Sequence, residues 1–284
     1  MKRRARTIAA SSAAALLACA CASVEPPQNR SEQQGAALNQ RAARAFEQGD
    51  YRRAAALYEQ ALRLNWGVEN PEGIAANALS LARAHQAGGD PLAAHRVLDG
   101  LLDQGPLAIP QASRSEAQAR KAQLYLDAND AARALEWSDR ALASCIDCAA
   151  LPAIQSLRGR VALAAGDHGA ALDWAGKALA ATGSGPGPGR AGERANALRL
   201  TGEARLARGE PQLAVAPLEQ ALEIDRGLGL PSRIRLDLMA LGRAHLQLGN
   251  RAAAREYFVR ARRVSEAVND QAGVSAASRA IEGL

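Results

Sequence analysis

Hydrophobic and small residues recur along most of this chain with helical spacing. The clearest stretch is 48–65 (QGDYRRAAALYEQALRLN), in which Ala54, Leu57 and Ala61 fall on one side of a helix. Apolar positions that repeat every three or four residues give a helix a single buried face. The Gly-Asp pair before this run is typical of one helix ending and another beginning. The pattern therefore predicts a helix that starts next to Asp50.

The break before this helix returns five more times, at spacings of 40, 40, 37, 43 and 40 residues. The six breaks are Gly49-Asp50, Gly89-Asp90, Asn129-Asp130, Gly166-Asp167, Gly209-Glu210 and Gly249-Asn250. Gly and Asn tolerate the left-handed backbone that ends many helices. Asp or Asn beside them can cap the next helix, and Glu210 is the weakest cap of the set. The regular spacing indicates an internal repeat built on a helix–turn–helix unit.

Small residues stand at fixed distances from each break. Seven residues before it come Ala42, Ala82, Ala122, Gly159, Gly202 and Gly242. Twelve residues further on come Ala54, Ala94, Ala134, Ala171, Ala214 and Ala254, and seven beyond those come Ala61, Leu101, Ala141, Ala178, Ala221 and Ala261. Small residues let two helices approach closely, so these positions predict the contact faces of each hairpin. Each hairpin then needs a neighbour to cover its apolar face.

Composition supports a wholly helical chain. Aromatic residues make up only 3% of the sequence, so a core built on large rings is excluded. Ala, Leu, Arg, Glu and Gln are frequent, and these residues lose little side-chain freedom in a helix. No alternating β-branched run of strand length is present. We therefore expect an all-α fold.

The breaks and the ladder of small residues resemble the tetratricopeptide repeat. That family has a small residue in helix A, a Gly-Asp-like turn followed by Tyr, and alanines in helix B; Asp50-Tyr51 matches the turn. The usual helix-A Trp is missing, and the period is longer than the family's roughly 34 residues. The resemblance implies a right-handed superhelical solenoid of about six helix hairpins with a C-terminal capping helix. The expected repeats are 35–68, 75–108, 115–148, 152–182, 195–228 and 235–268, and the capping helix is 269–284.

The family binds peptides on the concave side, which helix A lines. By that resemblance, the expected peptide-binding groove contains Asn39, Phe46, Arg83, Gln86, Gln123, Arg160, Arg199, Arg243 and Leu246. Such a surface would suit a peptide with apolar anchors and some acidic character. The competing interpretation is that the leucines of this register pack between helices: Leu126, Leu163, Leu206 and Leu246. The Lys and Asn set of chaperone-binding relatives is absent, which argues against a chaperone tail as partner.

The N-terminus has the pattern of an export signal. Residues 1–6 are basic, and residues 7–17 are uncharged and mostly apolar. Eleven helical residues span about 16 Å, too short for a bilayer core of roughly 30 Å. The segment therefore indicates a signal peptide rather than a membrane-spanning helix.

Leu16-Leu17-Ala18-Cys19 resembles the bacterial lipobox. The resemblance implies removal of 1–18, a diacylglycerol and an acyl chain on Cys19, and 19–34 as a lipidated tether. Ala20, in place of Asp, favours the outer membrane of a Gram-negative cell, with the chain facing the periplasm. Two alternatives stay open: Cys21 as the lipidated residue, or an ordinary secretory signal cut near Ala18 or Ala20.

Charge excludes one class of partner. The formal net charge is +6, but four of the 35 basic residues lie in the signal segment, which has no acidic residue. The remainder carries 31 basic and 29 acidic residues, a net charge of +2. Nucleic-acid binding usually needs a basic stripe, so we expect no nucleic-acid partner.

Cys145-Ile146-Asp147-Cys148 is the one motif with chemical potential. A zinc site needs further ligands, and a redox site needs a lowered thiol pKa. Cys145 is expected at a helix C-terminus, where the dipole disfavours a thiolate. In an oxidising compartment, a disulfide between Cys145 and Cys148 that holds the turn is the expected state, with free thiols or a redox or metal role as alternatives.

Known catalytic signatures are missing. The sequence has no nucleophile elbow, phosphate-binding glycine loop or zinc-protease helix motif, and its four histidines are isolated. We therefore expect no enzyme activity, no cofactor, no metal and no small-molecule substrate. Residues 183–192 (GSGPGPGRAG) are expected as a loop between repeats, either a hinge or a long solvated turn.

Together these features predict a non-catalytic scaffold lipoprotein that binds protein or peptide partners. Lipoproteins with tetratricopeptide repeats that resemble this layout include pilotins and tight-adherence pilus components. The expected role is assembly of an envelope machine such as a pilus or a secretion system. The alternative is an adaptor that recruits peptidoglycan hydrolases or proteases.

Overall fold

The computed structural model describes residues 30–103, 107–183 and 187–284. The signal segment 1–18, Cys19, Cys21 and most of the tether lie outside these described residues. Within them the chain forms thirteen α-helices and no strand. Their bounds are α1 Arg30–Glu47, α2 Tyr51–Gly67, α3 Pro71–Ala87, α4 Pro91–Leu102, α5 Gln111–Asp127, α6 Ala131–Ser144, α7 Leu151–Ala164, α8 His168–Thr182, α9 Pro188–Ala207, α10 Pro211–Gly227, α11 Pro231–Gln247, α12 Arg251–Ala267 and α13 Gln271–Glu282.

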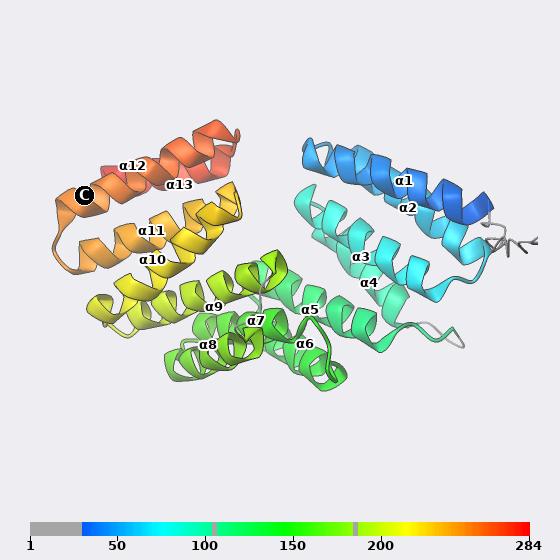
Figure 1. Cartoon of the computed structure of the whole chain (residues 1–284), viewed down its shortest axis with the longest axis horizontal. Coiled ribbons are helices and arrows are strands. Elements are labelled where there is room, and N and C mark those ends of the chain that lie inside the picture. The colour runs from blue at the N-terminus through cyan, green and yellow to red at the C-terminus, as the bar shows by residue number, and fades with distance from the viewer. Residues whose placement is uncertain (1–29, 104–106, 184–186) are drawn as a thin grey trace, which may run out of the picture.

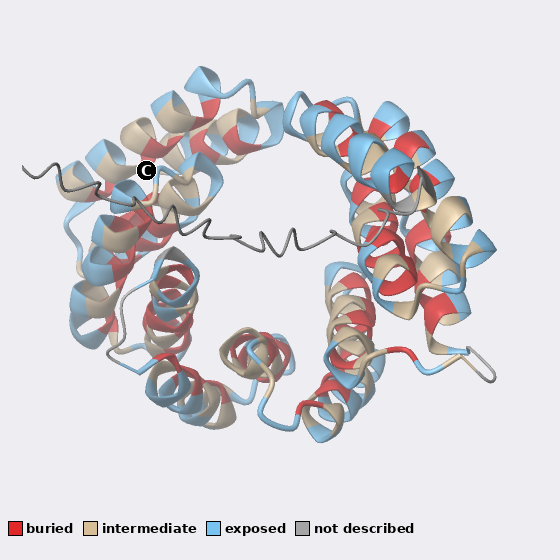
Figure 2. Ribbon diagram, turned by 45° about the vertical axis from the view of Figure 1, so that its right-hand side comes forward, coloured by how far each residue is buried: buried red, intermediate tan, exposed pale blue. Residues whose placement is uncertain are grey.

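The helices pair in chain order into six hairpins, and α13 packs on the last of them. The hairpins stack into an arc, with α1 and α2 at one end and α12 and α13 at the other (Figure 1). Turned by 45°, the arc has the outline of a ring (Figure 2). Successive odd-numbered helices also touch each other, from α3 through α11, and so form its inner layer. The predicted all-α solenoid with a capping helix is confirmed.

The six predicted breaks all adopt the expected backbone. Gly49, Gly89, Asn129, Gly166, Gly209 and Gly249 have φ angles between 58° and 82°, the left-handed region. The side chains of Asp50, Asp90, Asp130 and Asp167 each accept a hydrogen bond from the backbone three residues on. Glu210 makes no such bond, as expected, and neither does Asn250.

The small-residue ladder forms the contact between the helices of each hairpin. The six alanines of helix B in the series from Ala54 to Ala254 are all 0% exposed. The glycines that precede the breaks in helix A leave room for large side chains of neighbouring helices. A Cβ on Gly242 would come within 2.3 Å of the Phe258 ring. On Gly159 it would come within 2.4 Å of Leu200 Cδ2, from the next hairpin. These contacts set how closely helices and hairpins stack.

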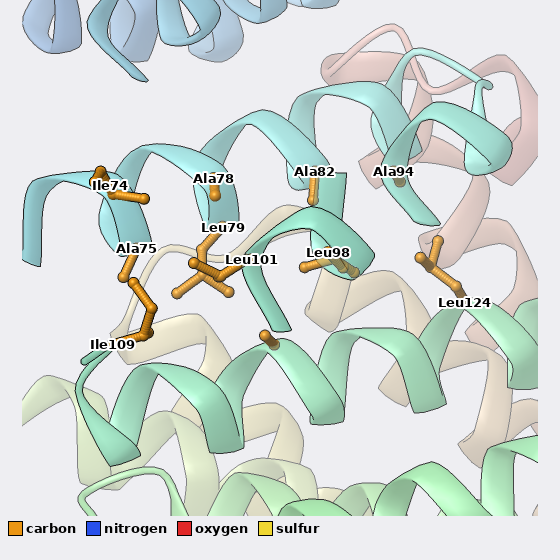
Figure 3. Packing of buried hydrophobic residues seen from close by; sticks show 11 residues of the cluster. Ile74, Ala75, Ala78, Leu79, Ala82, Ala94, Leu98, Leu101, Ile109 and Leu124 are labelled. Carbon is orange, nitrogen blue, oxygen red and sulfur yellow. The ribbon is translucent and has the colours of Figure 1, made fainter. Parts of the chain in front are cut away.

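Apolar side chains fill the space between neighbouring hairpins. Figure 3 shows one such cluster, to which α3 contributes Ile74 and Leu79 and α4 contributes Leu98 and Leu101. Ile109, just before α5, joins the same cluster. Buried residues in Figure 2 accordingly lie between helices along the arc.

The structure differs from the expectation at residues 183–192. Helix α9 already begins at Pro188, so half of the expected loop is helical. Proline suits the first turn of a helix because that turn does not use its N–H groups. The connection between α8 and α9 is therefore the short segment 183–187, and Gly192 packs inside α9 against Arg233 of α11.

Candidate functional site: the groove on the inner layer of helices

A groove of about 870 Å³ opens along the inner layer of helices. It is lined by α3, α5, α7, α9 and α11, together with the turn before α7. Its residues are Gln86, Glu116, Ala119, Arg120, Gln123, Ala149, Ala150, Ala153, Ile154, Ser156, Leu157, Arg160, Gly189, Glu193, Asn196, Arg199, Leu200, Glu203, Arg233 and Leu236. The volume suits a stretch of peptide, and pockets of this size are typical of binding sites.

The two central helices line the groove with different chemistry. The α7 wall is mostly apolar, with Ala153 and Leu157 before Arg160. The α9 wall presents Glu193 and Asn196. Residues three or four apart share one face of a helix, so the side chains that each helix presents to the groove come from one such face. The groove thus combines apolar surface with separated polar groups.

A chain of hydrogen bonds crosses the inner layer from one hairpin to the next. Gln86 of α3 donates to Asp127 of α5 at 2.8 Å, and Gln123 donates to the same carboxylate at 2.5 Å. Arg160 of α7 donates through Nη1 to Gln123 Oε1 at 2.7 Å. These side chains stand where successive repeats meet, so they hold α3, α5 and α7 in register. The structure places the predicted Gln86, Gln123 and Arg160 together in the groove.

Arg199 differs from the expectation of a free donor for peptide. Its side chain is only 9% exposed, and it binds two fully buried carboxylates, Asp225 of α10 and Asp237 of α11. The guanidinium Nε donates to Asp237 Oδ1 at 2.6 Å, and Nη1 donates to Asn196 Oδ1 at 3.1 Å. The physical reason is that two buried acids need a cation, and α9 is the helix that both α10 and α11 contact. Arg199 therefore holds the groove wall together.

The two acids are only partly compensated by this arginine. Asp225 Oδ1 and Asp237 Oδ2 receive no hydrogen bond from a neighbouring donor, although Arg233 Nη1 lies 4.0 Å from Asp225 Oδ1. Desolvation raises the pKa of Asp237 to about 7 and also raises the pKa of Asp225, against the opposing effect of Arg199. The neighbouring Asp225 carboxylate raises the pKa of Asp237 further.

Five other predicted groove residues lie on the inner helices but outside this groove. Phe46 packs edge-on against Tyr51, 5.1 Å between ring centres, and the Arg83 guanidinium lies 4.2 Å from the Phe46 ring. Asn39 is half-buried in α1, and its Oδ1 has no hydrogen-bond partner. Arg243 pairs with Glu203 at 3.4 Å, and Leu246 is 38% exposed. The inner layer is therefore not one continuous site.

The leucines of this register mostly pack between helices. Leu206 is buried, and Leu126 and Leu163 are half-buried against apolar clusters. Leu246 alone of the four is exposed. The alternative interpretation thus holds for three of these side chains.

Sequence reasoning missed the N-terminal half of the groove. Glu193, Asn196, Ala153 and Arg120 lie one to three turns before the register that the resemblance singled out. The same helical spacing, extended toward the N-terminus of each helix A, could have identified them. In α9 it was hidden because the preceding Gly/Pro segment was interpreted as loop.

The Cys145–Cys148 pair lies at the edge of the groove. The structure joins the two residues by a disulfide, with their Cα atoms 5.2 Å apart. Cys145 caps the C-terminus of α6, and Asp147 between them has a φ of 50°. Ala149 and Ala150, which line the groove, follow directly. The bond therefore constrains the turn that leads into α7.

Among the described residues, no three His, Cys, Asp or Glu side chains gather where they could hold a metal ion. In the same part of the chain, every helix is too short or too polar to cross a bilayer.

Trp137 lies between Lys121 and Arg140, and Trp174 lies beside Lys177, so both rings pack against cations outside the groove.

Comparison with known families agrees with this architecture. A model of the tetratricopeptide repeat matches residues 39–81 and 79–147, and a second model of the same repeat matches residues 238–266. These stretches coincide with the hairpins from α1 to α6 and with α11 and α12. The described chain has the fold of a tetratricopeptide-repeat solenoid.

Solved structures with this repeat fold align along most of the chain. BtubC (BKLC) from P. vanneervenii has 19% identity and a TM-score of 0.58, covering 85% of this chain and 93% of its own. PilW, a type IV pilus biogenesis factor, has 21% identity and a TM-score of 0.57, covering 80% and 92%. A Rap protein in complex with competence and sporulation factor has 15% identity and a TM-score of 0.60, covering 86% and 69%. No curated protein matches the chain.

At these identities the structural likeness shows the fold alone. Tetratricopeptide-repeat solenoids are in general scaffolds for protein interactions, and they use the concave surface that their stacked helices create. The chain accordingly has the architecture of a non-catalytic interaction scaffold, with the groove on its inner layer as the candidate site.

Proposed function

We propose that this protein is a periplasm-facing scaffold lipoprotein whose inner groove binds a segment of a protein partner during assembly of an envelope machine, such as a pilus or a secretion system. Cys19 carries the lipid, and 19–34 tethers the solenoid to the outer membrane. The groove holds the partner while the rest of the solenoid gives the partner a fixed position.

The observation that carries the binding proposal is the groove itself. A volume of about 870 Å³ opens along helices from five hairpins, and its α7 wall offers apolar side chains to an incoming segment. Main-chain and side-chain groups of a peptide could pair with the polar groups of the α9 wall. Peptide recognition in grooves of helical proteins uses this combination of apolar anchors and polar partners.

The localisation proposal is supported by the N-terminal sequence. A basic segment, a short apolar stretch and Leu16-Leu17-Ala18-Cys19 together form a lipoprotein signal. Several acyl chains on one residue give stable membrane anchoring, where a single chain would be marginal. The expected disulfide between Cys145 and Cys148 is compatible with an oxidising compartment.

The envelope role is supported by the fold of one solved structure. PilW, described as a type IV pilus biogenesis factor, shares the fold across 92% of its own length. The shared fold is compatible with a pilus role for this chain, and the lipoprotein signal would place it where such machines are built. Identification of the bound partner is therefore the decisive observation.

Site-specific photo-crosslinking in the native cell tests the proposal. A photoreactive amino acid replaces Ala153, which lines the groove, and in a matched control it replaces Ala180, which is exposed on α8 outside the groove. We expect a defined cross-linked envelope protein from position 153 that position 180 does not give. Pilus or secretion components would support the proposed machine, and cell-wall hydrolases would move the function to the adaptor alternative. Recovery of cytosolic proteins only would contradict the localisation.

A further inference from the structure

Seven charged side chains line the groove, and opposite charges of the described chain neutralise five of them. The neutralised pairs are Glu116 with Arg120, Glu203 with Arg243, Arg233 with Asp225, and Arg199 with Asp225 and Asp237. Arg160 and Glu193 are left without a partner of opposite charge among the described residues. The groove is thus close to neutral in total but carries one free charge of each sign.

Arg160 is exposed, and its one hydrogen bond goes to the neutral amide of Gln123. A guanidinium has five donors, so most of them stay open to a ligand. Glu193 is half-buried and accepts a hydrogen bond from Asn196 Nδ2 at 3.2 Å, again a neutral group. Each of these two charged groups is therefore hydrogen-bonded to a side-chain amide. Because the amide is neutral, the charge is not neutralised.

The two free charges lie at different levels on the two central helices of the groove. Arg160 follows Gly159 near the end of α7, as Glu203 follows Gly202 in α9, so the two occupy equivalent places in successive repeats. Glu193 precedes Glu203 by ten residues, near the start of α9. Ten helical residues rise about 15 Å, so the two charges differ in level by about 15 Å along the axes of α7 and α9.

Apolar surface lies between the two charges. Ala153 and Leu157 on α7 line this middle section. A ligand that placed both of its own charges on the groove would therefore lay uncharged side chains over these residues. A purely acidic segment would meet Glu193, and a purely basic one would meet Arg160, each with repulsion at one end.

From this arrangement we propose that the groove binds a bipolar protein segment, one with a basic residue for Glu193 and an acidic residue for Arg160, separated by apolar side chains. The 15 Å spacing corresponds to about four or five residues of an extended segment, or about ten of a helix. The opposite charges also fix the direction in which the segment lies. This proposal rests on the groove being the binding site for a protein segment.

Selection from a random-peptide phage library, with peptides long enough to span the groove, tests the proposal on the full chain. The variants are Arg160→Gln and Glu193→Gln, which remove one charge each and keep a polar side chain. The matched controls are Arg255→Gln and Glu219→Gln, at exposed positions of α12 and α10 outside the groove. A further variant, Ala153→Trp, fills the groove, and Ala180→Trp is its control on α8.

We expect peptides that bind the parent chain to carry a basic and an acidic residue at a constant spacing with apolar residues between them. Arg160→Gln should abolish enrichment of the acidic residue only, and Glu193→Gln enrichment of the basic residue only. Each should weaken a selected peptide about two- to fivefold, as expected for one solvated charge pair. The control variants should select the same peptides as the parent chain.

Two different failures are distinguishable. Peptides that Ala153→Trp excludes, but that show no paired charges or no change with the two charge variants, would overturn the bipolar ligand and leave groove binding intact. Peptides that bind Ala153→Trp as well as the parent chain would show that the groove is not the binding site. Circular dichroism of every variant checks that the helical fold is retained.

Discussion

Gly202 of α9 lies directly beneath Leu218 of α10: a Cβ at Gly202 would come within 2.4 Å of Leu218 Cγ. Leu218 is 0% exposed. The missing side chain at Gly202 therefore sets the distance between the two helices of the fifth hairpin. The same relationship recurs between Gly242 and Phe258 one hairpin later.

Replacement of Gly202 by alanine should destabilise the solenoid. Ala favours a helix over Gly by up to about 1 kcal/mol, but overpacking a full core typically costs about 1–3 kcal/mol. We expect a net loss of about 1–2 kcal/mol in the free energy of unfolding, measured by urea denaturation. Gly176→Ala is the matched control, because a Cβ there meets nothing within 4 Å and α8 should gain stability. Equal effects at both positions would contradict the packing argument.

Removal of the buried guanidinium should be more severe. Arg199→Met keeps much of the side-chain volume but leaves Asp225 and Asp237 buried without their cation. Loss of one partner of a buried ion pair costs about 3–5 kcal/mol. Asp225→Asn and Asp237→Asn added to Arg199→Met should recover part of this loss in the same denaturation assay. Strictly additive losses would show that the three side chains do not act as a unit.

The same cluster predicts a pH dependence of stability. Desolvation raises the folded-state pKa of Asp237 to about 7 from an ordinary value of 3.8, so the folded state binds more protons between these values. The contribution of Asp237 is full below about pH 4 and is lost as the pH rises through about 7.

Denaturation of the parent chain and of Asp237→Asn at several pH values isolates this contribution. The parent chain should lose stability relative to the variant between about pH 4 and pH 7, with little further change above that range. Subtracting the variant also cancels other titrating groups, including His95, whose pKa is lowered mainly by burial. A constant difference between the two proteins would refute a proton held by this pair.

The disulfide predicts a stability that depends on reductant. Peptide mass spectrometry of the exported protein should find Cys145 and Cys148 linked before reduction, and two free thiols there would contradict this expectation. A loop this short should contribute about 2 kcal/mol by restricting the unfolded chain. Cys145→Ser and Cys148→Ser together should lower stability by that amount and make it insensitive to reductant.

Anchoring is tested by Cys19→Ala in the full chain. We expect loss of lipid labelling and release of the protein from the membrane fraction. Labelling that persists in Cys19→Ala and disappears in Cys21→Ala would move the anchor to the second cysteine. Absence of label in the parent chain would favour an ordinary secretory signal.

The sequence by itself determined the repeated unit. The left-handed breaks such as Gly49, the caps such as Asp50 and the contact alanines such as Ala54 act within one hairpin, over short distances along the chain. Local backbone sterics and side-chain size govern such positions, so their residue types can be read directly. The all-α solenoid follows from that unit because each hairpin must cover the apolar face of the last.

Only the tertiary structure decided which inner side chains are open to a partner. Arg160 and Arg199 are both arginines in helix A, yet one is exposed and the other is buried between two acids from α10 and α11. Asp225 and Asp237 lie 26 and 38 residues away from Arg199, so their approach depends on how the hairpins stack. Burial and charge compensation are sums over such distant neighbours, which the spacing within one repeat cannot reveal.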